Sequence, residues 1–266
     1  MKTVSYVLFI VLFAGLSGYS QNTVDAQGKK QGYWKKTDEK TSKLQYEGLF
    51  KDDKPQGLFK YYYPNDSLRA KMFFVKDGKI SYATLYHPST AKKMAYGKYV
   101  GEVKDSVWTY YDESGTLISR DKYVMGKKDG TCYVYYPDGV VSEERNYKLD
   151  VQHGAFKQYY NNKALKGEGN YVNGQMEGKN AYYYPNGTAA ASGYYKGGTK
   201  NGPWIYKDKD GKITKKELYK YGAEASAKET EEFFSKTKLE PDSKKPGTDT
   251  NNKPKTDGKK TVSPKK

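Results

Sequence analysis

The sequence predicts an all-β fold, an elongated single-layer antiparallel sheet of tandem β-hairpins, followed by a short C-terminal helix and a disordered tail. A small residue returns every 24 or 25 residues and marks about eight repeats. These residues are Gly32, Gly57, Ser81, Ser106, Gly130, Gly154, Gly178 and Gly202. The chain holds 29 tyrosines although only 36% of its residues are hydrophobic. Such a composition is typical of a thin sheet and not of a thick apolar core.

The N-terminus predicts export. Residues 1–20 have the pattern of a cleavable signal peptide: Lys2, an apolar run from Val4 to Leu16, and small residues before Gln21. A membrane anchor is the alternative, but this run of 13 residues is shorter than the roughly 20 that a spanning helix needs. We therefore expect the protein in the periplasm or cell envelope, with residues 21–31 as an N-terminal segment before the repeats.

The first half of each repeat has the pattern of a β-strand. Counting the small residue as zero, aromatic or β-branched residues stand at positions two, four and six, as in Phe59, Tyr61 and Tyr63. Position five points to the opposite face and is a tyrosine in six repeats. We predict that these six tyrosines form a partner-binding surface: Tyr62, Tyr86, Tyr111, Tyr135, Tyr159 and Tyr183.

The second half of each repeat predicts a turn and a returning strand. Dipeptides such as Asp138-Gly139 and Asn186-Gly187 favour type I′ hairpin turns. An aromatic residue near position 17 marks the second strand, and a glycine-containing turn leads into the next repeat. Each repeat is thus expected to be a hairpin, and equivalent tyrosines of successive hairpins are expected to stack as ladders.

Two repeats depart from the pattern. The first lacks the tyrosine pair after Trp34 and is interpreted as an N-terminal cap. In the third, Ala83 and Leu85 replace the aromatic residues and Ser81 replaces the leading glycine, departures that the sequence does not explain. The repeat domain is predicted to cover residues 32–222.

The C-terminal part is predicted in two segments. Residues 223–239 are rich in alanine and charge and predict a short helix that closes the last edge of the sheet. Residues 240–266 are rich in lysine and proline and are predicted to be disordered, because they cannot bury enough apolar surface.

The repeats carry excess positive charge. Between Gln21 and Gly222 there are 35 basic and 23 acidic residues, a net charge of +12. This charge favours anionic partners. The solubility of a sheet exposed on both faces explains it equally well.

No residue pattern predicts a catalytic, metal or cofactor site. His87 and His153 lie almost three repeats apart, near predicted turns, and neither has the spacing of a zinc ligand. The lone cysteine, Cys132, occupies the slot that holds Trp108 and Phe156 in other repeats. Burial is expected for its thiol, with a reactive or intermolecularly paired thiol as the alternative. We therefore expect no enzyme activity.

The repeat resembles a known family. Its pattern is Gly-x-Trp/Phe-x-Tyr-Tyr, then Asn/Asp-Gly, then Tyr-x-x-Gly, and it is clearest in residues 178–202. It resembles the MORN repeat and, more closely, the variant of YwqK-type, antitoxin-like proteins, over about 190 residues. The resemblance implies hairpin sheets that scaffold proteins, dimerise and sometimes contact lipid. The antitoxin label implies that a toxin is bound and neutralised, although the predicted export differs from a cytoplasmic antitoxin.

These observations support three hypotheses. In the first, the chain is a non-enzymatic exported scaffold that holds a protein partner in the cell envelope. In the second, it is a binding module for an anionic glycan or lipid surface. In the third, it neutralises a toxin. Homodimerisation stays open, and nucleic acid is not an expected partner of an exported chain, although basic and aromatic residues interleave on the sheet.

Overall fold

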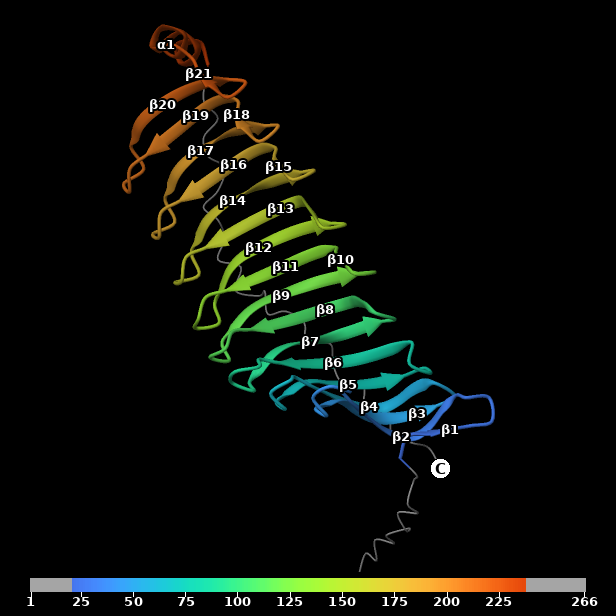
Figure 1. The fold of residues 1–266 in the computed structure, drawn as a ribbon. Helices are drawn as coiled ribbons and strands as arrows, with labels where there is room; N and C mark the ends of the chain where they lie inside the picture. Colours follow the sequence, from blue (N-terminus) through green and yellow to red (C-terminus); the bar gives the residue numbers. More distant parts are fainter. Residues whose placement is uncertain (1–20, 238–266) are drawn as a thin grey trace, which may run out of the picture. The chain divides into compact units, whose positions relative to one another are not determined.

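The computed structural model describes residues 21–237. The predicted signal peptide and the predicted disordered tail lie outside the described residues. The described chain divides into two units between His153 and Gly154. Each unit is an open antiparallel sheet whose strands follow one another in chain order (Figure 1). The predicted all-β fold of tandem hairpins is therefore confirmed.

Unit 1 covers residues 21–153 and pairs its strands as antiparallel neighbours. Its strands are β1 (Thr23–Val24), β2 (Lys30–Thr37), β3 (Leu44–Lys51), β4 (Lys54–Tyr62), β5 (Leu68–Val75), β6 (Ile80–Tyr86), β7 (Lys93–Val100), β8 (Val103–Tyr111), β9 (Leu117–Val124), β10 (Lys127–Lys128), β11 (Gly130–Tyr135), β12 (Val141–Lys148) and the first residues of β13 (Val151–Tyr159).

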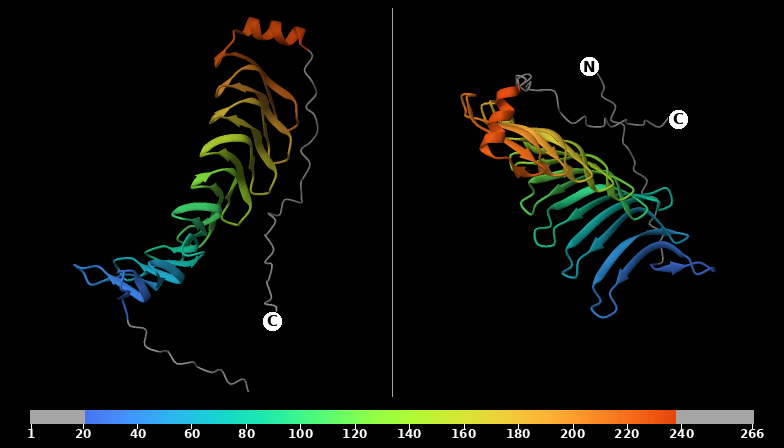
Figure 2. Two further views of the ribbon diagram at one scale, coloured as in Figure 1. Left: turned by 90° about the vertical axis from the view of Figure 1, so that its right-hand side faces the viewer. Right: turned by 90° about the horizontal axis from the view of Figure 1, so that it is seen from above.

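Unit 2 begins at Gly154, inside β13, and ends in a single helix. Its further elements are β14 (Leu165–Val172), β15 (Gln175–Met176), β16 (Gly178–Tyr183), β17 (Ala189–Lys196), β18 (Thr199–Lys200), β19 (Gly202–Lys207), β20 (Ile213–Lys220), β21 (Ala223–Glu224) and α1 (Ala227–Lys236). Figure 2 shows that the strands of this unit form one layer, with α1 beside its last strands.

The hairpin turns differ from the predicted type. Type I′ requires positive φ at both central residues. In the turn after β11, Gly139 has a φ of +84°, whereas Asp138 does not adopt positive φ. The carbonyl of Tyr136 accepts a hydrogen bond from the amide of Gly139, and the amide of Tyr136 donates to the carbonyl of Val140. This is a type I turn followed by a bulge, and the ladder register shifts beside it.

Type I′ turns occur at the other edge of the sheet, where one hairpin joins the next. Met125 and Gly126 have φ values of +49° and +84°, and Asn173 and Gly174 have +50° and +82°. The aspartate–glycine and asparagine–glycine pairs therefore predicted the position of a turn correctly. The type was wrong, because the type I′ turns lie at the opposite edge of the sheet. The turn after β11 is one residue longer than a two-residue type I′ loop. It needs positive φ only at its last residue, Gly139.

The small residue that opens most repeats marks a second bulge. Gly130 has a φ of +100° and is the first residue of β11, which follows the short strand β10, and both strands pair with β9. The third repeat lacks this bulge. Strand β6 pairs with β5 without a register shift, so Ser81 is not among the residues with positive φ. A glycine is unnecessary there, which explains the departure at Ser81.

Most of the buried side chains lie on one face of each sheet, which we call the packed face. It carries position two of each repeat, including Phe59 and Trp108 in unit 1 and Trp204 in unit 2, all almost fully buried. Each of these rings lies over a glycine of the preceding strand. A Cβ atom built on Gly97 would lie 2.4 Å from the Trp108 ring, and one on Gly193 would lie 2.3 Å from Trp204. The aromatic residue thus requires the glycine.

Where position two is small, its neighbour is larger. Ala83 pairs across the ladder with Met72 of the preceding strand. Ala83 is also part of a buried cluster with Trp108, against which Met72 and Leu85 pack. The substitutions of the third repeat therefore keep the packed face filled, because the volume moves to the adjacent strand.

Hydrogen bonds join successive repeats along the hairpin-turn edge. The Tyr63 hydroxyl donates to the carbonyl of Tyr86 at 3.0 Å, and in unit 2 the Tyr184 hydroxyl donates to the carbonyl of Lys207 at 2.9 Å. His87 stands at the same position of the third repeat, and its Nε2 bonds to the carbonyl of Tyr111 at 3.1 Å. This histidine therefore has the structural role of a tyrosine.

The predicted C-terminal helix is present but starts later than predicted. Ala223 and Glu224 form β21, which pairs with the end of β20. Helix α1 then begins after Ser226, whose side chain accepts from the amide of Glu229 in a capping box. None of the residues of α1 is buried, so the helix is held mainly by its cap and by contacts with β20.

The contact between ring and glycine can be tested by a double-mutant cycle. Gly97→Ala should lower the free energy of unfolding by about 1–3 kcal/mol, because the methyl group overpacks against Trp108. In a Trp108→Ala background the same change should cost little. Urea unfolding followed by circular dichroism measures both. An equal cost in the two backgrounds would contradict the proposed packing.

Candidate binding surfaces

The face opposite the packed face carries the odd positions of each repeat and is called the open face. From β4 to β7 in unit 1 its residues align in cross-strand rows. One row runs from Lys60 on β4 through Lys71 and Thr84 to Tyr96 on β7. No second layer covers these strands in residues 21–153 (Figure 1). The open face of this unit is therefore accessible to a partner.

The predicted site residue Tyr62 lies on the open face and binds a buried carboxylate. Its hydroxyl donates to Glu47 at 2.7 Å, the Tyr33 hydroxyl donates to the same carboxylate at 2.6 Å, and Lys60 lies 3.2 Å away. Burial raises the pKa of the Glu47 carboxyl, but these hydrogen bonds outweigh it and leave a pKa of about 2. Burial and the bond to Glu47 raise the pKa of Tyr62 to about 12.

The other predicted tyrosines are also half-buried against neighbouring strands. The Tyr111 ring stacks on Tyr96, with ring centroids 6.2 Å apart. Arg120 lies 5.7 Å from the centre of the Tyr135 ring. In unit 2 the Tyr183 hydroxyl donates to Glu168 at 2.9 Å. The two remaining tyrosines, Tyr86 and Tyr159, are half-buried as well.

This placement corrects the predicted tyrosine ladder. Each repeat contributes two strands, so a strand separates tyrosines of successive repeats by about 10 Å. Tyr62, Tyr111 and Tyr183 contact residues of that intervening strand. The position-five tyrosines thus help to hold adjacent strands together, and only their outer edges face solvent.

Sequence reasoning missed a group of exposed apolar side chains on the open face. Leu58, Phe73 and Tyr82 are direct cross-strand neighbours on β4, β5 and β6. Their exposed fractions are 49%, 51% and 55%. Position one of each repeat held part of the signal, since it is large and apolar in Leu58, Tyr82 and Val107 but polar in Lys179.

The packed face encloses lysines among aromatic rings. The Lys104 ammonium lies 4.9 Å from the centre of the Trp108 ring and 5.0 Å from that of Tyr110, whose hydroxyl lies 2.7 Å away. Burial lowers the pKa of Lys104. In unit 2, Lys200 lies 4.6 Å from the centre of the Trp204 ring. These cations cover the rings from solvent and contribute to the fold through cation–π contacts.

The residues singled out for chemistry do not converge. Cys132 is buried, as expected, and burial raises the pKa of its thiol. His87 is bonded to backbone, and within residues 21–237 no group of histidine, cysteine, aspartate or glutamate side chains is arranged to hold a metal ion. In the same residues no helix is long and apolar enough to cross a membrane.

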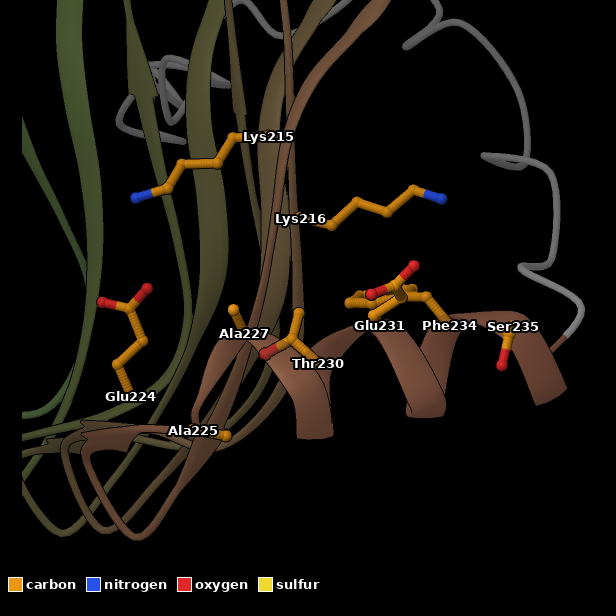
Figure 3. Close-up of a pocket in the computed structure, with 9 residues that line it drawn as sticks. All are labelled: Lys215, Lys216, Glu224, Ala225, Ala227, Thr230, Glu231, Phe234 and Ser235. Atoms are coloured by element: carbon orange, nitrogen blue, oxygen red, sulfur yellow. The ribbon is translucent and has the colours of Figure 1, made fainter.

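A shallow, open depression lies between α1 and β20 in unit 2 (Figure 3). Lys216 extends over α1, with its ammonium 5.2 Å from the centre of the Phe234 ring, whereas Lys215 points the other way. Glu231 and Thr230 of the helix complete its polar lining. The charged side chains that line it are exposed at the surface, and they are not arranged as an acid–base pair or around a nucleophile.

The family described as "MORN repeat variant" matches three segments of the chain, residues 55–76, 128–149 and 152–173. Each matched segment covers parts of two adjacent strands and the hairpin turn between them. The resemblance to MORN repeats inferred from the sequence is confirmed at these segments. No curated protein matches the chain.

Solved structures show only distant likeness. TarM from S. aureus is 11% identical, with 46% of this chain and 19% of that chain covered and a TM-score of 0.23. The Photorhabdus luminescens Tc holotoxin pore is 13% identical, with 76% of this chain and 13% of that chain covered and a TM-score of 0.23. This chain therefore spans less than a fifth of the length of either protein.

The buried Glu47 carboxylate predicts a dependence of stability on pH. Its pKa is lowered from 4.5 to about 2 in the folded state, so its contribution is present above pH 4.5. That contribution is lost as the pH falls towards 2, when the folded carboxylate is protonated. Glu47→Gln should reduce the free energy of unfolding by about 2 kcal/mol at pH 7 and by much less at pH 2.5. A pH-independent difference in urea unfolding would contradict this assignment.

Two tyrosine-to-phenylalanine variants test whether the hydrogen bond of the Tyr62 hydroxyl stabilises the fold. Tyr62→Phe removes a hydrogen bond to Glu47 and should cost about 1–2 kcal/mol of unfolding free energy at pH 7. Tyr86→Phe is the matched control at the same position of the next repeat, and it should change stability by less than about 0.5 kcal/mol. Equal costs for both variants would show that the hydroxyl of Tyr62 has no special role.

Proposed function

We propose that the chain is a non-enzymatic binding protein that is exported to the cell envelope and holds a protein partner on the open face of its hairpins. The observation that carries this proposal is the uncovered open face, with exposed apolar side chains in register on adjacent strands. Monomeric proteins seldom expose such side chains together without a partner. The matches to MORN repeat variants are consistent with a repeat-protein binding module.

The chemistry of the described residues supports binding and not catalysis. The two carboxylates within the sheet whose pKa values are lowered to about 2, Glu47 and Glu217, are both held by tyrosine hydroxyls and lysines of neighbouring strands. Their lowered pKa values result from these structural contacts. Neither carboxylate lies in a cavity beside a nucleophile, which an acid–base mechanism would require.

A second candidate function rests on the lysines of unit 2. Lys166, Lys179, Lys196 and Lys216 are exposed there, while Glu168 is bonded to Tyr183. Such an excess of cations would attract an anionic glycan or lipid surface. Binding to acidic polysaccharide that weakens steeply with salt and is lost in Lys179→Glu/Lys196→Glu would favour this function.

Toxin neutralisation is the special case in which the protein partner is a toxin. An adjacent gene for a growth-inhibiting protein, and relief of that inhibition by co-expression of this chain, would favour it. Toxin neutralisation and the scaffold function would use the same surface, so only the identity of the bound protein distinguishes them.

The proposed function predicts one stoichiometric protein partner in the envelope. The full-length, tagged chain should fractionate with the envelope, be cross-linked there and be purified under salt. A single protein should co-purify and then bind the purified chain in isothermal titration calorimetry at a fixed ratio. Deletion of residues 1–20 should leave the chain in the cytoplasm and abolish the complex. Recovery of bulk lipid or glycan alone would refute the proposal.

A further inference from the structure

The open face of unit 1 carries an apolar area that we call the Phe73 patch. Its first row is Leu58, Phe73 and Tyr82, which are directly paired on β4, β5 and β6. A second row lies two residues further along the strands, about 7 Å away. This row consists of Val75, Ile80 and Val100, which are also direct cross-strand neighbours.

The fold does not require apolar side chains at these positions. Position one holds Leu58 and Tyr82 in the patch and Val107 in the next repeat, but Thr131 and Lys179 in two later repeats. Both later repeats form the same hairpin, with β11 paired to β12 and β16 paired to β17. Since about half of each side chain in the first row stays in water, the apolar surface of that row contributes little to folding. Another requirement must select these residues.

Positive charge borders the patch. Lys71 lies on β5 two residues before Phe73, on the same face, and pairs across the ladder with Lys60. Within residues 21–237, Lys71 has no ion-pair partner, whereas Lys60 is held by Glu47. On the far side Lys98 pairs with both Tyr82 and Asp105, and its ammonium forms an ion pair with that aspartate. One exposed cation thus stands unpaired beside the apolar rows.

We infer that the Phe73 patch is the docking site for a protein segment that presents apolar side chains to the two rows and a carboxylate to Lys71. This inference rests on the proposed function and specifies its surface and the chemistry of its partner. The apolar rows supply the buried contact area, and Lys71 sets the orientation of the bound segment.

The charges distinguish this partner from two other occupants. An anionic bilayer would gain little attraction here, because Glu47 and Asp105 neutralise the lysines paired with them on either side of the patch. A single free cation, Lys71, attracts an anionic surface only weakly. A second copy of the chain, packed face to face, would offer Lys60 and Lys71 where the patch requires a carboxylate. A partner with acidic residues beside its apolar ones matches both features.

A peptide library tests the inference without knowledge of the natural partner. Random 12-residue peptides displayed on phage are selected on the full chain, and enriched sequences are synthesised for fluorescence anisotropy. We expect enrichment of apolar residues together with aspartate or glutamate. Phe73→Ser/Tyr82→Thr should weaken binding of these peptides at least about tenfold. Lys179→Thr, at the position equivalent to Tyr82 in unit 2, is the matched control and should leave binding unchanged.

The charge of the partner is tested by Lys71→Glu. This variant should weaken the acidic peptides about tenfold, and selection on it should enrich lysine and arginine instead. All variants change exposed side chains, so their thermal unfolding should match that of the parent chain. Enriched peptides without acidic residues, or no enrichment at all, would overturn the inference.

Three further outcomes would also overturn it. Light scattering that shows a dimer of the parent chain and a monomer of Phe73→Ser/Tyr82→Thr would assign the patch to a second copy. Binding to vesicles of anionic phospholipid that is lost in this variant would assign it to a membrane. If the envelope partner binds the variant and the parent chain equally, the proposed function survives and the patch does not carry it.

Discussion

The constraint on which both units depend is the close approach of an aromatic ring to the backbone of the preceding strand. A single layer has no second sheet to cover it, so a large side chain is buried only by lying flat on its own sheet. Trp108 does this over Gly97, and Trp204 does it over Gly193. Lysines such as Lys104 then cover the rings from the solvent side. Hydrophobic burial in this protein is therefore a property of neighbouring strands and not of a central core.

The period of the repeat made most of the fold predictable. Glycine every 24 or 25 residues reports a backbone conformation that other residues adopt with difficulty, and the structure places positive φ at most of these positions. The turn type was wrong because an aspartate–glycine pair is compatible with two loops that differ by one residue, as at Asp138. Ser81 was inexplicable from sequence because the regular register of β6 depends on pairing with β5.

The candidate site was less predictable than the fold. Tyrosines at position five are conspicuous in the sequence, yet residues such as Tyr62 are engaged by the adjacent strand, whose register no local pattern reveals. Leu58 and Phe73 lie at opposite ends of the second repeat and Tyr82 lies in the third, and the three become neighbours only when β4, β5 and β6 pair. Alternation places a side chain on a face, but cross-strand pairing decides which side chains act together.

The bond from a tyrosine hydroxyl to the next repeat has a consequence for how such chains lengthen. Tyr160 donates to the carbonyl of Tyr183, and Tyr184 in turn donates to the carbonyl of Lys207, each 23 residues ahead. The repeat that opens at Gly178 thus receives this link at Tyr183 and gives it from Tyr184. A gene duplication that inserts one whole copy would find matching groups on either side, so the array can grow by copying without any new fit having to evolve.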